Sequence, residues 1–379
     1  MDATLVEKLT AWRRHLHANP ELSKQEKETA AFVQAKLAEL GIESTGGIGG
    51  HGVVATISRG SSNRSVGLRA DMDALPIVEK TGLPHASTHP GVMHACGHDG
   101  HTTSLLGAAA LLQADQSWSG TVHFVFQPAE EGQGGAKAMM ADGLFTRFPM
   151  ERIFSYHNWP GLEAGTVAVH HGPVMAAGAR IHFTIDGTSG HAALPHLTRD
   201  PVVAAGHLIV GLQSIVARNV DPLQAGVISL GVMEAGGAMN QIPGKVVLRG
   251  TCRYYTEETR RALEDGMNRV AEGVALMMGV RIAVEIVPGV GPTINNAAAA
   301  RLAEQATKAA GLALRTDLPP AMTGEDFGWM LQACPGAYVW IGNGPGIDLH
   351  NDGYDYNDAI LPAASSYLAQ VARRALAEG

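Results

Sequence analysis

The chain has 379 residues, of which 45% are hydrophobic and 17% charged, so its composition indicates a globular protein and excludes a disordered one. The formal net charge is −8 and no basic patch stands out, which argues against nucleic acid as a partner. The chain lacks both an apolar signal core at its start and a run of about 18 apolar residues, so we predict no membrane span. The chain has three cysteines. This small, odd number argues against a disulfide framework and for a reducing compartment, so we predict a cytoplasmic protein.

The first part of the chain alternates two kinds of segment. Apolar residues at helical spacing predict helices, and short apolar runs predict strands, as expected for an α/β sheet that is largely parallel. The run 122–127 is apolar apart from His123, which is typical of a strand covered on both faces. The predicted helices are 2–18, 24–40, 101–113 and 135–144, and the predicted strands are 53–57, 66–70, 122–127 and 153–156.

After Pro173 the order of elements changes to strand, helix, two strands, helix and strand, which is the ferredoxin-like arrangement. Helices and strands alternate again afterwards, so this α+β segment is predicted to be an inserted domain over residues 176–289. Residues 1–175 and 290–379 then form one discontinuous α/β domain, with a mostly parallel central sheet flanked by helices. The predicted elements are, in order, 179–185, 200–217, 224–233, 245–254, 257–278, 280–287, 297–310, 324–331 and 338–341.

Seventeen histidines prompt a search for a metal site, and the stretch from Met93 to His101 is the first candidate. Cys96 and His98 lie two residues apart on a predicted loop before a helix. Thiolate and imidazole are ligands that suit Zn²⁺ or another divalent transition metal, and a helix N-terminus stabilises a thiolate. The alternative interpretation is a polar loop with one buried cysteine, and ligand chemistry favours the metal.

The second candidate is Gln127–Gly135, which follows a strand and contains Glu130 and Glu131. Adjacent side chains diverge, so one carboxylate can bind metal while the other acts as a general base. A solvated acidic turn is the competing interpretation, but α/β sheets place their sites at the carboxyl ends of strands.

Three further strand-end loops offer residues of the same kind. His157 follows the strand 153–156, and His350 lies among polar residues after the last strand. Asp71 and Asp73 end another strand on one side of an extended chain, where they can orient a metal ligand or form a salt-bridged turn. Each loop alone is a weak indication, but their convergence on one sheet edge predicts a metal site.

These motifs resemble those of the M20 metallopeptidase family, in particular its branch of hippurate hydrolases, aminoacylases and auxin-conjugate hydrolases. The matching segments are LRADMDALP, MHACGHDGHT, QPAEEGQGGA, HNWPGLEAG, MTGEDF and LHNDGYDYND, which cover nearly the whole chain in order. The resemblance implies a catalytic α/β domain with two divalent metal ions, with Zn or Mn expected and Ni or Co as alternatives. It also implies an inserted ferredoxin-like lid domain that often mediates dimerisation, so a homodimer or higher homo-oligomer is expected.

By this resemblance the metal ligands are Cys96, His98, Glu131, His157 and His350, and Glu130 is the general base. Wider M20 peptidases carry a histidine-x-aspartate motif where this chain has Asp71-Met-Asp73. That departure leaves open how the five ligands divide between the two ions, and whether Cys96 bridges them.

The resemblance also assigns residues of the inserted domain. His191, in GTSGHAALPH, aligns with a histidine that relatives supply from a partner subunit and that contacts the developing oxyanion. Asn240, in MNQIPG, and Arg253, in GTCRY, match positions that contact substrate. For Arg253 an ion pair on the strand surface is the alternative.

The implied reaction is metal-dependent hydrolysis of the amide bond of an N-acyl-L-amino acid, a small-molecule substrate. Two alternatives stay open at this point. The first is an N-acetyl-diaminopimelate deacetylase in lysine biosynthesis, which the same motifs fit. The second is an inactive homologue that binds a metal or ligand, against which the intact Glu130 argues, because a binding protein needs no general base.

Overall fold

The computed structural model describes residues 1–378, which fold into two compact units. The first unit comprises Met1–Val174, Thr293–Pro320 and the chain from Asp326 onward, and the second comprises Met175–Pro292 with Ala321–Glu325. The chain therefore leaves the first unit, builds the second and returns.

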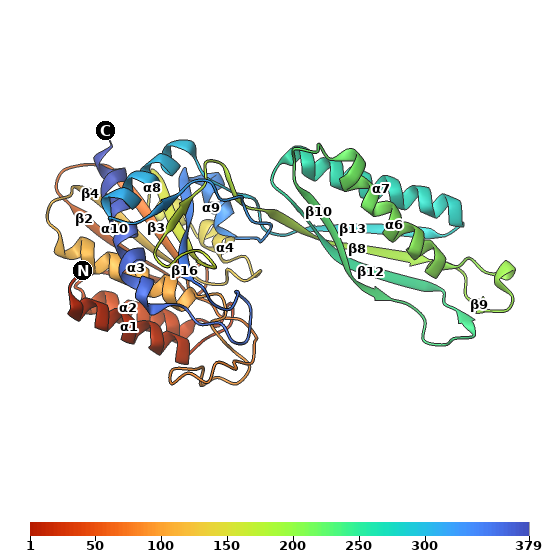
Figure 1. Cartoon of the computed structure of the whole chain (residues 1–379), viewed down its shortest axis with the longest axis horizontal. Coiled ribbons are helices and arrows are strands. Elements are labelled where there is room, and N and C mark those ends of the chain that lie inside the picture. The colour runs from red at the N-terminus through yellow and green to blue at the C-terminus, as the bar shows by residue number, and fades with distance from the viewer. Residues whose placement is uncertain (379) are drawn as a thin grey trace. The chain divides into compact units, whose positions relative to one another are not determined.

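An eight-stranded sheet forms the centre of the first unit (Figure 1), in the order β1-β2-β4-β3-β5-β16-β6-β15. The strands β4, β3, β5 and β16 run parallel, whereas β2 and β6 run antiparallel to their neighbours β4 and β16. This confirms the predicted α/β class with a mostly parallel sheet. The bounds are β1 Ser44–Ile48, β2 Gly52–Arg59, β3 Ser65–Asp71, β4 Gly120–Gln127, β5 Arg152–Pro160, β6 Val167–Val169, β15 Leu314–Arg315 and β16 Gly336–Gly344.

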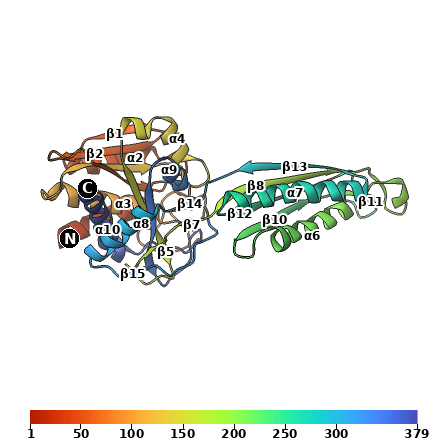
Figure 2. The same ribbon diagram turned by 90° about the horizontal axis from the view of Figure 1, so that it is seen from above.

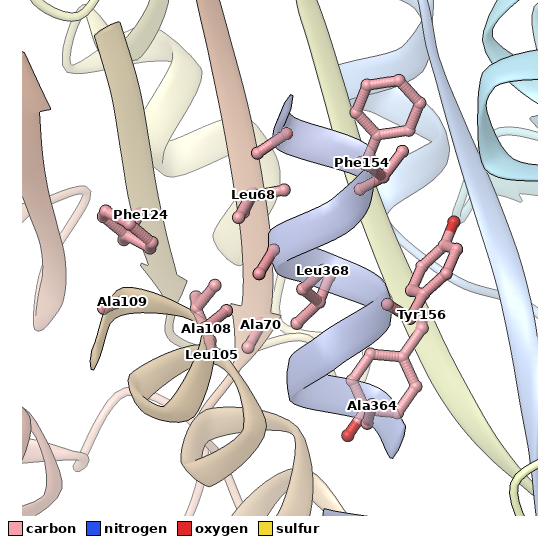
Figure 3. Close-up of a cluster of buried hydrophobic side chains, with 14 of the residues drawn as sticks. Leu68, Ala70, Leu105, Ala108, Ala109, Phe124, Phe154, Tyr156, Ala364 and Leu368 are labelled. Carbon is pink, nitrogen blue, oxygen red and sulfur yellow. The ribbon is translucent and has the colours of Figure 1, made fainter. Parts of the chain in front are cut away.

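Helices cover the sheet because alternate strand residues carry apolar side chains to a common core. In Figure 3, Leu68 of β3 and Phe154 of β5 lie beside Leu368 of α10, and Leu105 of α3 lies beneath β3. Burial of such side chains contributes about 1.5–3 kcal/mol each. The helices are α1 Ala3–Ala18, α2 Lys27–Glu39, α3 His98–Ala114, α4 Gly135–Ala141, α5 Leu144–Arg147, α8 Ala297–Ala309, α9 Phe327–Ala333 and α10 Leu361–Ala377, with a 3₁₀ turn at Asp358–Ile360.

Helix α3 begins earlier than the sequence predicts, at His98 rather than at 101. Gly97 precedes it in the left-handed conformation with φ 88°, which glycine adopts without strain. The end of the Cys96–His98 motif therefore lies in the first helical turn and not on a loop. Nearly every side chain of α3 is buried, so the helix is packed on all sides and holds its first turn rigidly.

Several short strands escaped prediction, among them β1, β6 and β15. Strands of two or three residues are too short to show a two-residue period, and β1 contains two glycines where apolar residues would signal a strand. They form through pairing with longer neighbours, which is a tertiary effect.

The second unit is ferredoxin-like, as predicted, with a four-stranded antiparallel sheet in the order β10-β12-β8-β13. Helices α6 and α7 lie side by side on one face of this sheet (Figures 1 and 2). A separate ribbon pairs β9 with β11. The short strands β7 and β14 pair with each other, and β14 belongs to the first unit. The bounds are β7 Pro173–Met175, β8 Ala177–Asp186, β9 Gly190–His191, a 3₁₀ turn at Pro195–Leu197, α6 Pro201–Asn219, β10 Gly226–Glu234, β11 Gln241–Ile242, β12 Lys245–Tyr254, α7 Glu257–Met278, β13 Arg281–Pro288 and β14 Thr293–Ile294.

Helix α6 bears on the prediction that the chain has no membrane span. Among the described residues it is the one helix long and apolar enough to do so by length and composition, with 33% of its most apolar stretch buried. A count of consecutive apolar residues misses it, because glycines, histidine and glutamine interrupt the run. Its buried face, including Leu208, Leu212 and Ile215, packs in the core of the second unit, and core helices commonly pass the same test.

Candidate functional site

The predicted ligands of the first unit converge at one edge of the eight-stranded sheet. Asp71 ends β3 and is paired in register with Gln127 of β4, after which Glu130 and Glu131 follow. His157 lies near the end of β5, which is the next strand in the sheet. Parallel strands end on the same edge, so three loops distant in sequence meet there.

The candidate donor atoms lie within a few ångströms of one another. The thiol Sγ of Cys96 is 3.4 Å from Nε2 of His157, and Nε2 of His350 is 3.2 Å from Oε1 of Glu131. His98 contributes Nε2 at 4.0 Å from the same Glu131 oxygen. Three overlapping groups place all their donors within 4.8 Å: Cys96, His98 and His157; Cys96, Glu131 and His350; and His98, Glu130 and Glu131.

The histidines are oriented as metal-binding histidines are. His98 directs Nδ1 to the backbone oxygen of Asp73 at 2.8 Å, and His157 directs Nδ1 to the oxygen of Asn158 at 2.7 Å. Each ring is thereby left with Nε2 directed at the cluster, where Nε2 of His98 is buried 3.8 Å from Asp71, beyond hydrogen-bond range. Fixing one ring nitrogen so that the other can bind a cation is the usual device in metal sites.

The electrostatics of the cluster also favour a bound cation. Burial and the nearby Glu131 carboxylate raise the pKa of the Cys96 thiol well above its usual value. Burial lowers the pKa of His157 well below its usual value. A divalent ion would reverse the balance, because it deprotonates a coordinating thiol and binds neutral imidazole. The donor set of one thiol, three imidazoles and the Glu131 carboxylate therefore fits divalent metal.

Asp71 and Asp73 form a buried layer behind the donors. Asp71 accepts hydrogen bonds from Arg69 at 2.9 Å and from Nδ1 of His101 at 2.6 Å. Burial alone would raise the pKa of Asp71, but the charges of His98, His101 and Arg69 hold it well below the usual value. The structure thus places Asp71 in a buried charge network and leaves it a carboxylate.

Asp73 connects two of the predicted ligands. Its side chain accepts from the backbone N–H of Glu131 at 3.0 Å, lies 3.2 Å from Nδ1 of His98, and accepts from the hydroxyl of Ser23 at 2.6 Å. One carboxylate therefore fixes both the ring of His98 and the backbone of Glu131.

Glu130 is 8% exposed and is held by a residue that the sequence singled out only as part of MTGEDF. The backbone N–H of Asp326 donates to Oε1 of Glu130 at 3.2 Å. The Asp326 carboxylate accepts from the N–H of Ala136 at 2.9 Å and from Gln127 at 2.6 Å. The acidic pair in that motif was visible in the sequence, but no spacing rule relates it to Glu130.

The three predicted residues of the second unit, His191, Asn240 and Arg253, lie in two different places. His191 pairs with Gln241 in the β9–β11 ribbon, and the N–H of Ala192 donates to the oxygen of Asn240 at 3.0 Å, so His191 and Asn240 lie together. Arg253 pairs with Gly178 near the far end of β12, eight residues beyond Lys245, or roughly 26 Å along a strand.

Arg253 does not match the ion-pair interpretation. Its Nη1 donates to the backbone oxygen of Cys252 at 3.0 Å, and its guanidinium lies against Gly178. Within residues 1–378 no carboxylate forms a salt bridge with it. The half-buried cation is therefore available to an anionic group.

Comparison with known proteins reveals relatives along the whole chain. The model of peptidase family M20/M25/M40 matches residues 67–374. An N-acetyl-L-cysteine deacetylase of Bacillus subtilis is 40% identical over 99% of this chain and 89% of its own length. A hippurate hydrolase of Campylobacter jejuni is 41% identical over 96% of this chain and 95% of its own. The crystal structure of Bacillus subtilis YXEP, described as a dinuclear metal-binding peptidase, has a TM-score of 0.89 and 35% identity, covering 99% of both chains.

Proposed function

The chain belongs to peptidase family M20/M25/M40, and we propose that it hydrolyses the amide bond of N-acyl-L-amino acids to a carboxylate and a free amino acid. One observation supports this most strongly: Glu130 lies beside a cluster of thiol, imidazole and carboxylate donors that suits divalent metal. The names of the two similar enzymes, a deacetylase of N-acetylcysteine and a hippurate hydrolase, describe reactions of this class.

Two divalent ions would be held by Cys96, His98, Glu131, His157 and His350, in keeping with the dinuclear description of YXEP. We propose Zn²⁺ or Mn²⁺, with Ni²⁺ or Co²⁺ as alternatives, because all four accept imidazole and carboxylate ligands. When bound, such ions supply Lewis acidity, which lowers the pKa of water and polarises a carbonyl. The three cysteines are free and buried, which fits the reducing cytoplasm.

Glu130 is proposed as the general base. Oε1 of its neighbour Glu131 lies 3.2 Å from Nε2 of His350 and 4.0 Å from Nε2 of His98, so we assign Glu131 as the ligand and Glu130 as the base. Glu130 takes a proton from the attacking water and later delivers it to the leaving amine, which would otherwise depart as an unstable anion.

The second unit is proposed to complete the site, with His191 at the oxyanion and Asn240 and Arg253 at the substrate's carboxylate. A single lid cannot bring all three to one small substrate, because Arg253 lies roughly 26 Å along β12 from Lys245, and the β9–β11 ribbon lies before Lys245. We therefore propose a homodimer in which one copy provides His191 and Asn240 to a site that uses the Arg253 of the other.

The test is a panel of substrates with enzyme reconstituted separately with Zn²⁺, Mn²⁺, Co²⁺ and Ni²⁺. Hippurate, N-acetyl amino acids including N-acetylcysteine, and N-acetyl-diaminopimelate are assayed by release of free amine. We expect turnover of at least one N-acyl amino acid, two ions per chain, and loss of turnover on chelation.

Activity confined to N-acetyl-diaminopimelate would replace the proposed substrate by the deacetylase alternative. Stoichiometric metal binding without turnover of any amide would instead identify an inactive homologue.

A further inference from the structure

The residue that precedes Glu130 has an unusual backbone conformation. Ala129 has a positive φ of 54°, in the left-handed region that is unfavourable for residues with a Cβ. Its oxygen accepts from the N–H of Gly135 at 2.9 Å, which closes the loop that carries Glu130 and Glu131. The direction in which the chain enters Glu130 therefore depends on a conformation that alanine does not adopt unaided.

A fully buried carboxyl group holds this conformation. Oε1 of Glu26 accepts hydrogen bonds from the N–H of Ala129 at 2.8 Å and from the N–H of Lys24 at 2.9 Å. Lys24 is also left-handed, with φ 68°, so one oxygen binds the amides of two strained residues. Such bonds are strong when the acceptor is a carboxylate.

The side chain of Glu26 binds this loop, although Glu26 is the N-cap residue of α2. Its side chain makes no capping bond to the helix. Glu21 caps the helix instead: its carboxylate accepts hydrogen bonds from the N–H groups of Glu28 at 3.1 Å and Thr29 at 2.7 Å. Two of the free amides at the start of α2 are therefore satisfied without the side chain of Glu26.

Glu26 differs from the other anchors of the loop. Asp73 holds the N–H of Glu131 but also contacts His98, a proposed ligand, so changing Asp73 disturbs the metal. Glu26 holds the residue before Glu130 and has no hydrogen bond to a proposed ligand.

A pocket lies on one side of the loop that contains Ala129. Pro128, Ala129 and Lys24 border a pocket of about 230 Å³, whose other walls include Gly49, Gly50 and His51. Ala129 itself is 3% exposed, so packing on its other sides and the hydrogen bond to Glu26 together hold the backbone there.

We propose that Glu26 is a positioning residue for Glu130: its Oε1 fixes Ala129 in the left-handed conformation and so aims the Glu130 carboxylate. The inference rests on the proposed function only in taking Glu130 as the general base. Glu26 acts through the backbone of Ala129 and has no role as a metal ligand or in substrate contact.

The experiment compares Glu26→Ala and Glu26→Gln, each alone and combined with Ala129→Gly, by kcat, KM and metal content. Glu26→Ala is expected to lower kcat about tenfold or more, with KM and metal content little changed, because Ala129 loses its acceptor. Glu26→Gln retains an accepting oxygen and is expected to keep most of kcat. Glycine at 129 adopts positive φ without strain, so Ala129→Gly should restore much of the kcat lost in Glu26→Ala.

Lys24→Gly provides the matched control, because it relieves the same strain at the other residue bound by Glu26. Added to Glu26→Ala it should restore no activity. Equal rescue by Lys24→Gly, wild-type kcat in Glu26→Ala, or loss of metal from that variant would each overturn the proposal. If Glu26→Ala does not fold, Ala129→Val replaces it, since a β-branched residue resists positive φ; unchanged kcat would then overturn the proposal.

A crystal structure of Glu26→Ala separates this inference from the proposed function. We expect Ala129 to leave positive φ and the Glu130 carboxylate to turn, whether or not an amide substrate has been found. An unchanged loop would overturn the positioning role, whereas a changed loop in a protein that cleaves no amide would overturn only the proposed function.

Discussion

The two units present most of their proposed functional residues in opposite ways, although His350 of the first unit is also exposed. In the first, Asp71, His98 and His157 are buried and each makes at least one hydrogen bond that orients it. In the second, His191 and Asn240 are exposed on a two-residue ribbon, and Arg253 is half-buried at a distance from them.

This difference distinguishes the residues of the proposed site that their own unit holds in place from those that it leaves exposed. Buried hydrogen-bonded groups keep their geometry without a ligand, because their conformational entropy is already lost when the protein folds. The exposed side chains of His191 and Asn240 have no such support, which is consistent with the proposed homodimer. The buried residues of the first unit are therefore preorganised, and the exposed residues of the second are the ones that the proposed homodimer would bring to the site of another copy.

The largest effect expected tests the preorganised unit. Glu130→Gln should lower kcat about 10³-fold, because it removes the proton acceptor while keeping shape and neighbours. Metal content measured by mass spectrometry should stay at the wild-type value, with Glu131→Gln as the matched variant that loses metal. Near wild-type kcat in Glu130→Gln would show that another group is the base.

A smaller effect is expected in the second unit. His191→Ala should lower kcat about 100-fold through loss of an oxyanion donor, with metal binding unchanged. Subunits of His191→Ala and Glu130→Gln, unfolded together and refolded, should regain about a quarter of wild-type activity, because half the dimers are mixed and each has one intact site.

The control for that mixture pairs Glu130→Gln with His157→Ala. Both changes lie in the first unit, so no combination of copies yields an intact site and no activity should return. If the His191→Ala mixture also stays inactive, the exposed ribbon does not serve a second copy.

The next effect concerns the carboxylate that joins two ligands. Asp73→Asn should weaken metal binding about 10- to 100-fold, since it disturbs both the ring of His98 and the N–H of Glu131. Competition with a chromogenic chelator measures this. Asp186→Asn, on the sheet of the second unit, should leave metal affinity unchanged.

The smallest effect is a pH dependence of stability in the first unit. Burial lowers the pKa of His17, but its hydrogen bonds to Asp99, at 2.8 Å, and Glu79 outweigh this and raise it to about 9. A raised pKa stabilises the fold fully below the unfolded value of about 6.5, and this contribution is lost as the pH rises through 9. Unfolding in urea should therefore show a loss on the order of 1 kcal/mol between pH 7 and 8.5.

His17→Gln is the control for that titration, because it keeps a polar side chain but has no proton to lose in this range. The slope of stability against pH should be shallower in the variant. Identical slopes would show that His17 does not carry a stabilising proton.

Prediction from the sequence succeeded where periodicity was long. Helix 257–278 and strand 245–254 have the bounds predicted. An amphipathic pattern over ten or more residues indicates the element even where single residues do not fit the period. It failed at β6 and β15, which exist through pairing, and at the start of α3, where Gly97 permits a turn that the pattern does not encode.

The site divides in the same way. Cys96, His98, Glu130 and Glu131 carry their chemistry in residue type and spacing, so the sequence alone indicates a metal-dependent hydrolase. Glu26 is an ordinary acidic residue whose neighbours in sequence reveal nothing, and Asp326 lies in MTGEDF without a spacing that relates it to Glu130. They reach the loop of Glu130 from 103 and 196 residues away. Hydrogen bonds between buried groups depend on distances of about 3 Å, which only the packed fold fixes.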